Sequence, residues 1–317
     1  MTDLTAAHFH DASEARKYLE ALRWPSGPVC PFCGSVDDAY ATKRAGVYRC
    51  AAKECRKDFS VTIGTIFERS HVALDKWLLA FRLMAGSKKG MSANQLHRTL
   101  GVTHKTAWFM AHRIREAMMD TTSAPIGGEG KVIEVDETFL SAKRAYTPEK
   151  GAHKKSGSHG ARHAVLTIVE RKGRAKSVRL AALKSRDIEN IVREQADVRS
   201  HFMTDEAPHY KQIGTWFEGH ETVNHSRKEY ARGDVTTNTV EGFFSIFKRG
   251  MKGIYQHCGE QHLHRYLAEF DFRYSNRAAM EIDDTMRTDL ALKGAEGKRL
   301  TYSQTGSGKA SQENDAP

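Results

Sequence analysis

Residues 132–140 read VIEVDETFL. Its Val, Ile, Thr and Phe residues favour a pleated, half-buried surface, so the stretch is predicted to be a β-strand. Three carboxylates, Glu134, Asp136 and Glu137, interrupt the apolar residues. Because an unpaired charge is costly to bury, acids inside a strand usually meet a cationic partner or a metal ion.

The segments after this strand alternate between strand and helix patterns. Two more strands, a helix, a short fourth strand and a late helical region are predicted at His163–Arg171, Ser177–Leu183, Arg186–Ala196, His201–Thr204 and from about Asn238. This order is that of an α/β domain with a mixed sheet.

Acidic residues fall at informative places in that order. Asp136 lies in the first strand, Asp205 follows the fourth, and Glu241 begins the late helix. If the first and fourth strands are neighbours, their two carboxylates can meet at one metal ion. Three carboxylates from three elements can hold two Mg²⁺ ions, and two such ions clamp the attacking and leaving oxygens of a phosphodiester.

Each acid also has a simpler interpretation. Asp205 suits a turn at a strand end. Glu241 suits a capping box with Asn238, three residues earlier. Glu134 shares a strand face with Asp136 and is an alternative ligand, whereas Glu137 points to the other face.

The late helix carries two basic residues beyond its acid. Lys248 follows Glu241 by seven residues, two helical turns, and lies on the same face. Lys248 and Arg249 are predicted to hold a DNA phosphate beside the metal ions. The alternative is a solvated basic face.

Four cysteines near the N-terminus have the spacing of a zinc site. Cys30 and Cys33 are two residues apart, Cys50 and Cys55 are four apart, and a hairpin turning at Ala45-Gly46 is predicted between the pairs. Two short knuckles supply the four soft ligands of a tetrahedral Zn²⁺ ion, with Gly34 in the positive-φ conformation that closes the first. Cys258, far along the chain, is predicted to be a packed small residue.

A helical pattern follows the cysteines. Residues 92–100 and 104–114 form two predicted helices joined by a turn at Gly101, which is the helix-turn-helix pattern, with Ser92 and Thr103 as N-caps. His104, Lys105 and Thr106 are predicted to face DNA, while Trp108, Met110 and Ile114 pack inward. The alternative is a plain three-helix bundle.

The overall charge agrees with a nucleic-acid partner. The chain of 317 residues has 49 Lys and Arg against 39 Asp and Glu, a net charge of +10. It contains no run of 18 apolar residues and no signal-peptide pattern, so we expect a cytoplasmic, reducing location and no membrane span.

A basic, Gly-containing segment at residues 141–163 follows the first strand of the domain. It is predicted to be a loop that orders on DNA, and its candidate contacts are Lys143, Arg144, Lys154 and Lys155. The alternative is a solvated loop. The polar, Gly- and Ser-rich tail from about Lys293 is predicted to be disordered.

These motifs, in this order, resemble a known family. CPFCGS, YRCAAKECRKDFSVTIGTIFERS, LDKWLLAFRLMAGSKKGMSANQLHRTLGV, KTAWFMAHRIREAM, VDETFL, TDEAPHY, NTVEGFFSIFKRG and HLHRYLAEFDFRYSNR span about residues 20–280. Together they are similar to bacterial insertion-sequence transposases of the ISXO-like group, which carry a zinc ribbon before an RNase H-like DDE domain.

The resemblance implies DNA transposition with two Mg²⁺ or Mn²⁺ ions. Asp136 and Asp205 match the first two catalytic acids of the family. The third ligand varies within the group. Glu241 is the preferred candidate because a carboxylate is the better hard ligand, and because Lys248 lies where DDE enzymes place a basic residue; Asn238 is the rival.

The expected layout has five parts: a helical arm (1–22), a zinc ribbon with one structural Zn²⁺ (23–66), a helix-turn-helix region (67–122), an RNase H-like domain with a mixed five-stranded sheet (129–285) and a disordered tail (286–317). The expected partner is double-stranded DNA, both transposon ends and target. We expect association with the bacterial nucleoid and a homo-oligomer in the active complex.

The expected reaction is cleavage at the ends, bound through their inverted repeats, followed by attack of the freed 3′ hydroxyl on target DNA. Two rival functions are a catalytically inactive DNA-binding regulator and an RNase H-like structure-specific nuclease.

Overall fold

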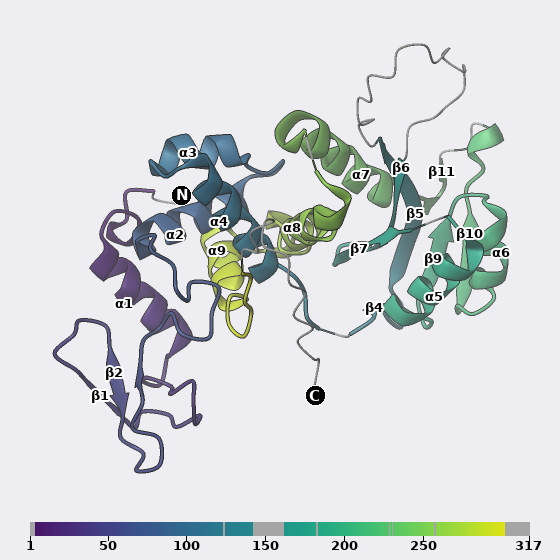
Figure 1. The fold of residues 1–317 in the computed structure, drawn as a ribbon. Helices are drawn as coiled ribbons and strands as arrows, with labels where there is room; N and C mark the ends of the chain where they lie inside the picture. Colours follow the sequence, from purple (N-terminus) through teal and green to yellow (C-terminus); the bar gives the residue numbers. More distant parts are fainter. Residues whose placement is uncertain are drawn as a thin grey trace, which may run out of the picture.

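A helical assembly and a β-sheet lie side by side in the computed structural model, with the cysteine-bearing hairpin at the far end of the helices (Figure 1). The structure describes residues 4–122, 124–141, 162–181, 183–227, 229, 231–256 and 258–301. None of the helices in that part of the chain combines the length and apolar character needed to cross a membrane.

The cysteine-bearing region is a small three-stranded sheet. Its strands are antiparallel in the order β1 (Ala39–Ala41), β2 (Tyr48–Cys50) and β3 (Asp58–Phe59). The predicted hairpin between the cysteine pairs is confirmed, with Gly46 at φ 72° in its turn. Gly34 has the expected positive φ, 77°. Glycine adopts this backbone conformation at little steric cost, so both turns stay tight.

The helical assembly draws on both ends of the chain. Its members are α1 (Ala12–Arg23), α2 (Leu74–Gly86), α3 (Ala93–Leu100), α4 (His104–Ala117) and α9 (Asp284–Lys293). They share one core, in which Trp77, Leu78, Phe81 and Met84 of α2 are fully buried. The large apolar side chains of α2 therefore form the face that packs on the rest of the assembly.

The prediction of a disordered tail from residue 286 is wrong for its first part. α9 packs against α2 and α4, and Ala291, Leu292 and Ala295 are buried there. The backbone continues by pairing with the cysteine-bearing region, where Ile66 N–H donates to the Ala295 carbonyl. Apolar residues spaced at i, i+1 and i+4 hold this segment despite its polar composition.

The helix-turn-helix has the predicted caps. Ser92 forms a capping box with Gln95, Gly101 adopts the left-handed conformation after α3, and the Thr103 hydroxyl accepts the Thr106 N–H. Met110 and Ile114 are buried as predicted. Trp108 is only partly buried, because its ring lies against His112 at the edge of the assembly.

The second half of the chain contains a five-stranded mixed sheet in the order β10-β9-β5-β6-β7. Three consecutive antiparallel strands are followed by two that run parallel to the first, as expected for the α/β domain with a mixed five-stranded sheet. The strands are β5 (Val132–Ser141), β6 (Arg162–Glu170), β7 (Ala175–Leu180), β9 (His201–Thr204) and β10 (Gly219–Thr222).

Helices cover both faces of this sheet. One face packs on α5 (Ser185–Gln195) and α6 (Pro208–Gly214), and the other on α7 (Asn238–Gly250) and α8 (Leu263–Ser275). Odd-numbered apolar residues of β5 face α5 and α6, so its even-numbered residues, Glu134 and Asp136 among them, face α7.

The remaining elements are short connections. They are the 3₁₀ segments Ala7–Phe9, His225–Arg227, Glu260–His262 and Ala278–Met280, the π-helical segment η3 (Met251–Tyr255), and the strand pairs β4 (Ile126–Gly127) with β8 (Ala196–Asp197) and β11 (Ala231–Arg232) with β12 (Val235–Thr236).

Candidate active site

Asp136 and Asp205 lie level with each other on neighbouring strands. β5 and β9 run parallel and pair Glu134 with Met203. Two residues further along this register, Asp136 is opposite Asp205, the first residue after β9. Parallel neighbours are about 4.8 Å apart, so the two carboxylates start from adjacent backbone positions. The expected neighbourhood of the two strands is confirmed.

Glu134 is the acid that has a cationic partner. Its side chain is fully buried and accepts from Arg171 Nε at 2.6 Å. It also accepts the backbone N–H groups of Thr239 and Val240, at 2.7 and 3.0 Å, and the Thr239 hydroxyl. These are orphan donors of the first turn of α7, where an anion is favourable. Glu134 is thus a structural anchor for α7, and the alternative of a metal ligand does not fit its saturated contacts.

This anchor fixes the position of Glu241. Glu241 lies in the first turn of α7, two residues after Thr239, whose backbone N–H donates to Glu134. Its Oε1 accepts the Thr237 hydroxyl at 2.9 Å and lies 3.5 Å from Nε2 of His225. The N-cap residue is Thr237, and it makes no side-chain cap bond, so the alternative capping box with Asn238 does not form.

The electrostatics of Asp136 show that these acids share one environment. Burial raises the pKa of Asp136 to about 7, and the carboxylates of Glu137, Asp205 and Glu241 add to the rise, against the Glu137 N–H bond that lowers it. In the part of the chain that the structure describes, no Lys, Arg or His forms an ion pair with Asp136 or Asp205. Neighbouring carboxylates without a cationic partner repel one another, and a bound metal ion would offset that repulsion.

The third acid of the opening stretch points to the opposite face. Glu137 accepts from His209 Nε2 and from the Tyr210 hydroxyl, both at 2.8 Å, on α6. Burial raises the pKa of Glu137, and these hydrogen bonds oppose the rise. Glu137 thereby ties α6 to the sheet directly behind Asp136.

Two residues beside the site escape sequence reasoning. Glu206 accepts the N–H groups of His225 and Ser226, which turns the segment His225–Arg227 toward α7 and brings His225 to Glu241. A lone His sixteen residues before Glu241 gives no signal in the sequence. Only the fold brings the two together.

The donor set suits a hard divalent cation, but not one shared at close range by all three acids. Among the described residues, the cysteines form the only group of three or more potential ligands whose ligand atoms all lie within 4.8 Å of one another. Two Mg²⁺ ions about 4 Å apart, with bonds of about 2.1 Å, would join carboxylates up to about 8 Å apart. Asp136, Asp205 and Glu241 share one electrostatic environment, but among the described residues they do not form such a close ligand group.

The other predicted residues of α7 are exposed. Lys248 is exposed two turns along, about 10 Å by helical rise, with its Nζ 5.9 Å from the Phe244 ring centre. Arg249 is exposed and bonds Ser245. Asn238 is exposed, and its backbone N–H donates to the Thr236 hydroxyl.

The predicted DNA-binding turn of α4 opens onto a groove. His104 and Lys105 are exposed. The hydroxyl and the backbone N–H of Thr106 both form hydrogen bonds with the Thr103 hydroxyl. The groove, about 590 Å³, separates the helix-turn-helix from η3, and Arg98 and His104 line it. Lys143, Arg144, Lys154 and Lys155 lie outside the described residues.

The cysteines have the geometry of a metal centre. The Sγ atoms of Cys30 and Cys55 are 3.7 Å apart, and those of Cys33 and Cys50 are 3.6 Å apart. A tetrahedron with metal–sulfur bonds of about 2.3 Å has edges of about 3.8 Å. The predicted set therefore fits one Zn²⁺ ion. Cys258 packs against the α7–α8 core instead, as predicted.

Comparison with known families matches two parts of the chain. Residues 127–275 match the family described as ISXO2-like transposase domain, and residues 11–58 match the family described as transposase zinc-ribbon domain. The second match includes α1, which the expected layout assigned to a separate arm.

Individual relatives are more distant. A Halobacterium salinarum protein described as an uncharacterized protein in transposable element ISH50 is 25% identical over 291 residues, covering 84% of this chain and 91% of the relative. The Mos1 strand transfer complex is 11% identical with a TM-score of 0.29, covering 71% of this chain and 79% of that one. The Mos1 paired-end complex is also 11% identical, with a TM-score of 0.19, and covers 64% and 77%.

Proposed function

Because this chain is an insertion-sequence transposase with an N-terminal zinc ribbon, we propose that Asp136, Asp205 and Glu241 hold two Mg²⁺ or Mn²⁺ ions that catalyse DNA cleavage and strand transfer. The observation that carries the proposal is the pair of level acids on β5 and β9, with no cation in the described residues to neutralise them. Glu241 completes the set because its charge acts on Asp136.

The bound ions would activate a water or a 3′ hydroxyl and stabilise the charge that develops on the phosphate. The chain's own task is positioning. Glu134 and Arg171 hold the N-terminus of α7 on the sheet, so Glu241 is carried by a rigid element. Rigid placement of the acids is what phosphoryl transfer requires, since no protein nucleophile takes part.

DNA recognition is proposed for the helix-turn-helix and the ribbon. The exposed His104 and Lys105 and the groove-lining Arg98 supply donors for phosphates and base edges. Lys248 and Arg249 would extend the basic surface toward the acids. Because two transposon ends have to be joined, assembly of two or more copies on DNA is part of the proposal.

The test is an end-cleavage assay with DNA from the flanks of the gene, with and without Mg²⁺. Asp136→Asn, Asp205→Asn and Glu241→Gln should each abolish cleavage while leaving end binding largely intact. Glu194→Gln, an exposed acid on the opposite face of the sheet, is the matched control and should cleave normally. Cleavage by Asp136→Asn at the wild-type rate would refute the assignment.

The same assay separates the rivals. A DNA-binding regulator would bind the ends without cutting them under any metal condition. A structure-specific nuclease would cut branched DNA but leave the 3′ end unjoined to a target plasmid. Asn238→Ala tests the third ligand: loss of Mg²⁺-dependent cleavage in this variant, with cleavage retained in Glu241→Gln, would transfer the role to Asn238.

A further inference from the structure

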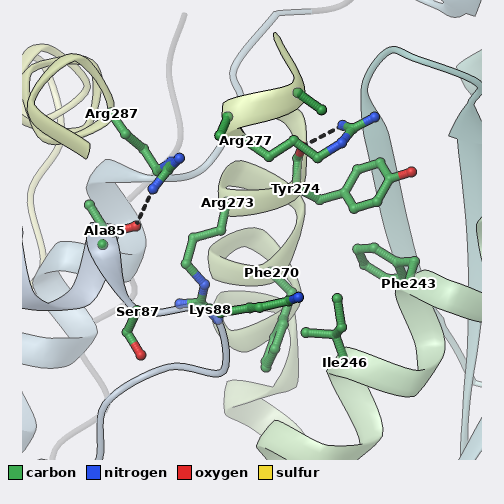
Figure 2. A pocket seen from close by; sticks show the side chains of 13 residues that line it. Ala85, Ser87, Lys88, Phe243, Ile246, Phe270, Arg273, Tyr274, Arg277 and Arg287 are labelled. Atoms are coloured by element: carbon green, nitrogen blue, oxygen red, sulfur yellow. Dashed lines mark hydrogen bonds between the residues drawn. The ribbon is translucent and has the colours of Figure 1, made fainter. Parts of the chain in front are cut away.

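A pocket of about 380 Å³ lies between the end of α2, α7, α8 and the start of α9, outside the acid site. In Figure 2, Phe243 and Ile246 of α7 lie across from the α2 end, with α8 between them. The side chains that matter for a ligand are Lys88, Phe243, Ile246, Phe270, Arg273 and Tyr274, which all line this pocket. The volume is in the range of small-molecule sites.

The lining combines two chemical characters. Aromatic and aliphatic side chains form one wall, with Phe243 and Tyr274 in edge-to-face contact at 5.4 Å. The remaining polar lining includes four Lys or Arg residues and no acid. A ligand for this pocket therefore needs a flat or apolar body and a negative charge.

Arg273 marks where the charge would bind. Its side chain is only 6% exposed, and Nη1 pairs with Glu269. Nε and Nη2 are buried and have no partner. These two nitrogens form one side of the guanidinium fork, the geometry that holds a phosphate or carboxylate with two parallel hydrogen bonds.

The charge balance around Arg273 points the same way. Glu269 is fully buried and also pairs with Arg115 at 2.7 Å, so one carboxylate serves two arginines. The cluster thus has an excess positive charge inside the protein, where an uncompensated charge is costly. Lys88 is exposed, and in Figure 2 its side chain extends toward the α7 side of the pocket.

We propose that this pocket binds one nucleotide, with its phosphate on the free fork of Arg273 and on Lys88 and its base against Phe270, Tyr274 and Ile246. The proposal deepens the proposed function, because DNA supplies this chemistry to a transposase. Arg273 lies over the Phe270 ring at 4.6 Å and Arg277 over the Tyr274 ring at 4.0 Å, so the base would stack on the aromatic and aliphatic surface that these cations leave open. The nucleotide comes either from an unstacked position of bound DNA or from free nucleotide, and the experiment separates the two sources.

The first arm is calorimetric titration of the full-length, zinc-loaded chain with deoxyadenosine monophosphate, inorganic phosphate and deoxyadenosine. The monophosphate should bind at least about tenfold more tightly than either fragment, because phosphate and base each contribute contacts. Lys88→Ala should weaken it about tenfold, the loss of one charge-assisted contact. Lys89→Ala, an exposed neighbour that does not line the pocket, should not.

Ile246→Trp fills the pocket from a half-buried position and should abolish binding at an unchanged thermal midpoint and zinc content. Equal losses in Lys88→Ala and Lys89→Ala would show general electrostatic attraction and overturn the proposal. So would equal affinity for phosphate and the monophosphate, or binding that survives Ile246→Trp.

The second arm places 2-aminopurine at successive positions of DNA from the flanks of the gene. Fluorescence that rises at one position with wild type, but not with Ile246→Trp, assigns the pocket to an unstacked DNA nucleotide. Monophosphate binding with no such position assigns it to free nucleotide. Asp136→Asn should lose cleavage yet keep both signals, so failure of the metal site and failure of the pocket are distinguishable.

Discussion

Replacing Asp136 by Asn is expected to stabilise the folded chain while removing a proposed catalytic carboxylate. Burial, with nearby carboxylates, raises the pKa of Asp136 from 3.8 to about 7. That rise of about 3 units corresponds to about 4 kcal/mol at about 1.4 kcal/mol per unit. Since Asp136 keeps some exposure, we expect Asp136→Asn to gain about 2–4 kcal/mol at pH 8. The amide oxygen of Asn can still accept the Glu137 N–H.

The sign follows from proton linkage. The folded state binds the Asp136 proton more tightly than the unfolded state does, because the folded pKa is the higher one. The contribution of this group to stability is therefore fully present below about pH 4 and is lost as the pH rises to about 7. Burial raises the pKa of Asp271 to about 7 as well, so the informative quantity is the difference between wild type and variant.

The assay is thermal and urea unfolding of zinc-loaded protein at pH 5 and pH 8 without added Mg²⁺. The stability gain of Asp136→Asn should be larger at pH 8 than at pH 5. Saturating Mg²⁺ should stabilise wild type and not the variant, since only a state that binds the ion is stabilised by it. A variant that is less stable than wild type at pH 8 would contradict this prediction, because Asp136 would then be a structural acid like Glu134.

Three further outcomes are expected. Glu134→Ala should lower the free energy of unfolding in urea by about 3–5 kcal/mol, since it removes the only carboxylate partner of Arg171 among the described residues and leaves two helix N–H groups without their acceptor. The half-exposed Glu241→Ala should change it by less than about 1 kcal/mol, and equal losses in the two variants would contradict the anchor role. Cys30→Ser should lose zinc and weaken end-DNA binding in gel shifts; unchanged affinity would remove the ribbon from recognition. Lys248→Ala should weaken end binding and flatten its salt dependence, and an unaltered salt slope would leave Lys248 merely solvated.

Features that depend on neighbouring residues were predicted correctly from the sequence. The hairpin between the cysteine pairs, the caps at Ser92 and Thr103 and the strand at VIEVDETFL each depend on residues close in sequence. Turn residues, capping side chains and β-branched runs act within a few residues, so a sequence displays them directly. The same holds for Cys30 and Cys33, because their spacing alone indicates a metal-binding knuckle.

Contacts between segments that are distant along the chain were harder to predict from the sequence. The tail prediction failed at α9 because its burial depends on a groove supplied by α2, some two hundred residues earlier. Trp108 looked like a core residue by helical period, yet the assembly ends beside it. The pocket at Arg273 has no sequence signal, since its walls come from four helices that are distant along the chain.

The acids, the thiolates, the caps and the order of the strands and helices can all be predicted from the amino-acid sequence. The role of each acid in VIEVDETFL depends on the folded arrangement. Glu134 meets Arg171 and the start of α7, Glu137 bonds to His209 and Tyr210 of α6, and Asp136 lies near Glu137, Asp205 and Glu241 with no cationic partner among the described residues. The physical reason is that the charge state and role of a buried carboxylate depend on what the fold places within a few ångströms of it, and strand neighbours are chosen by the sheet as a whole.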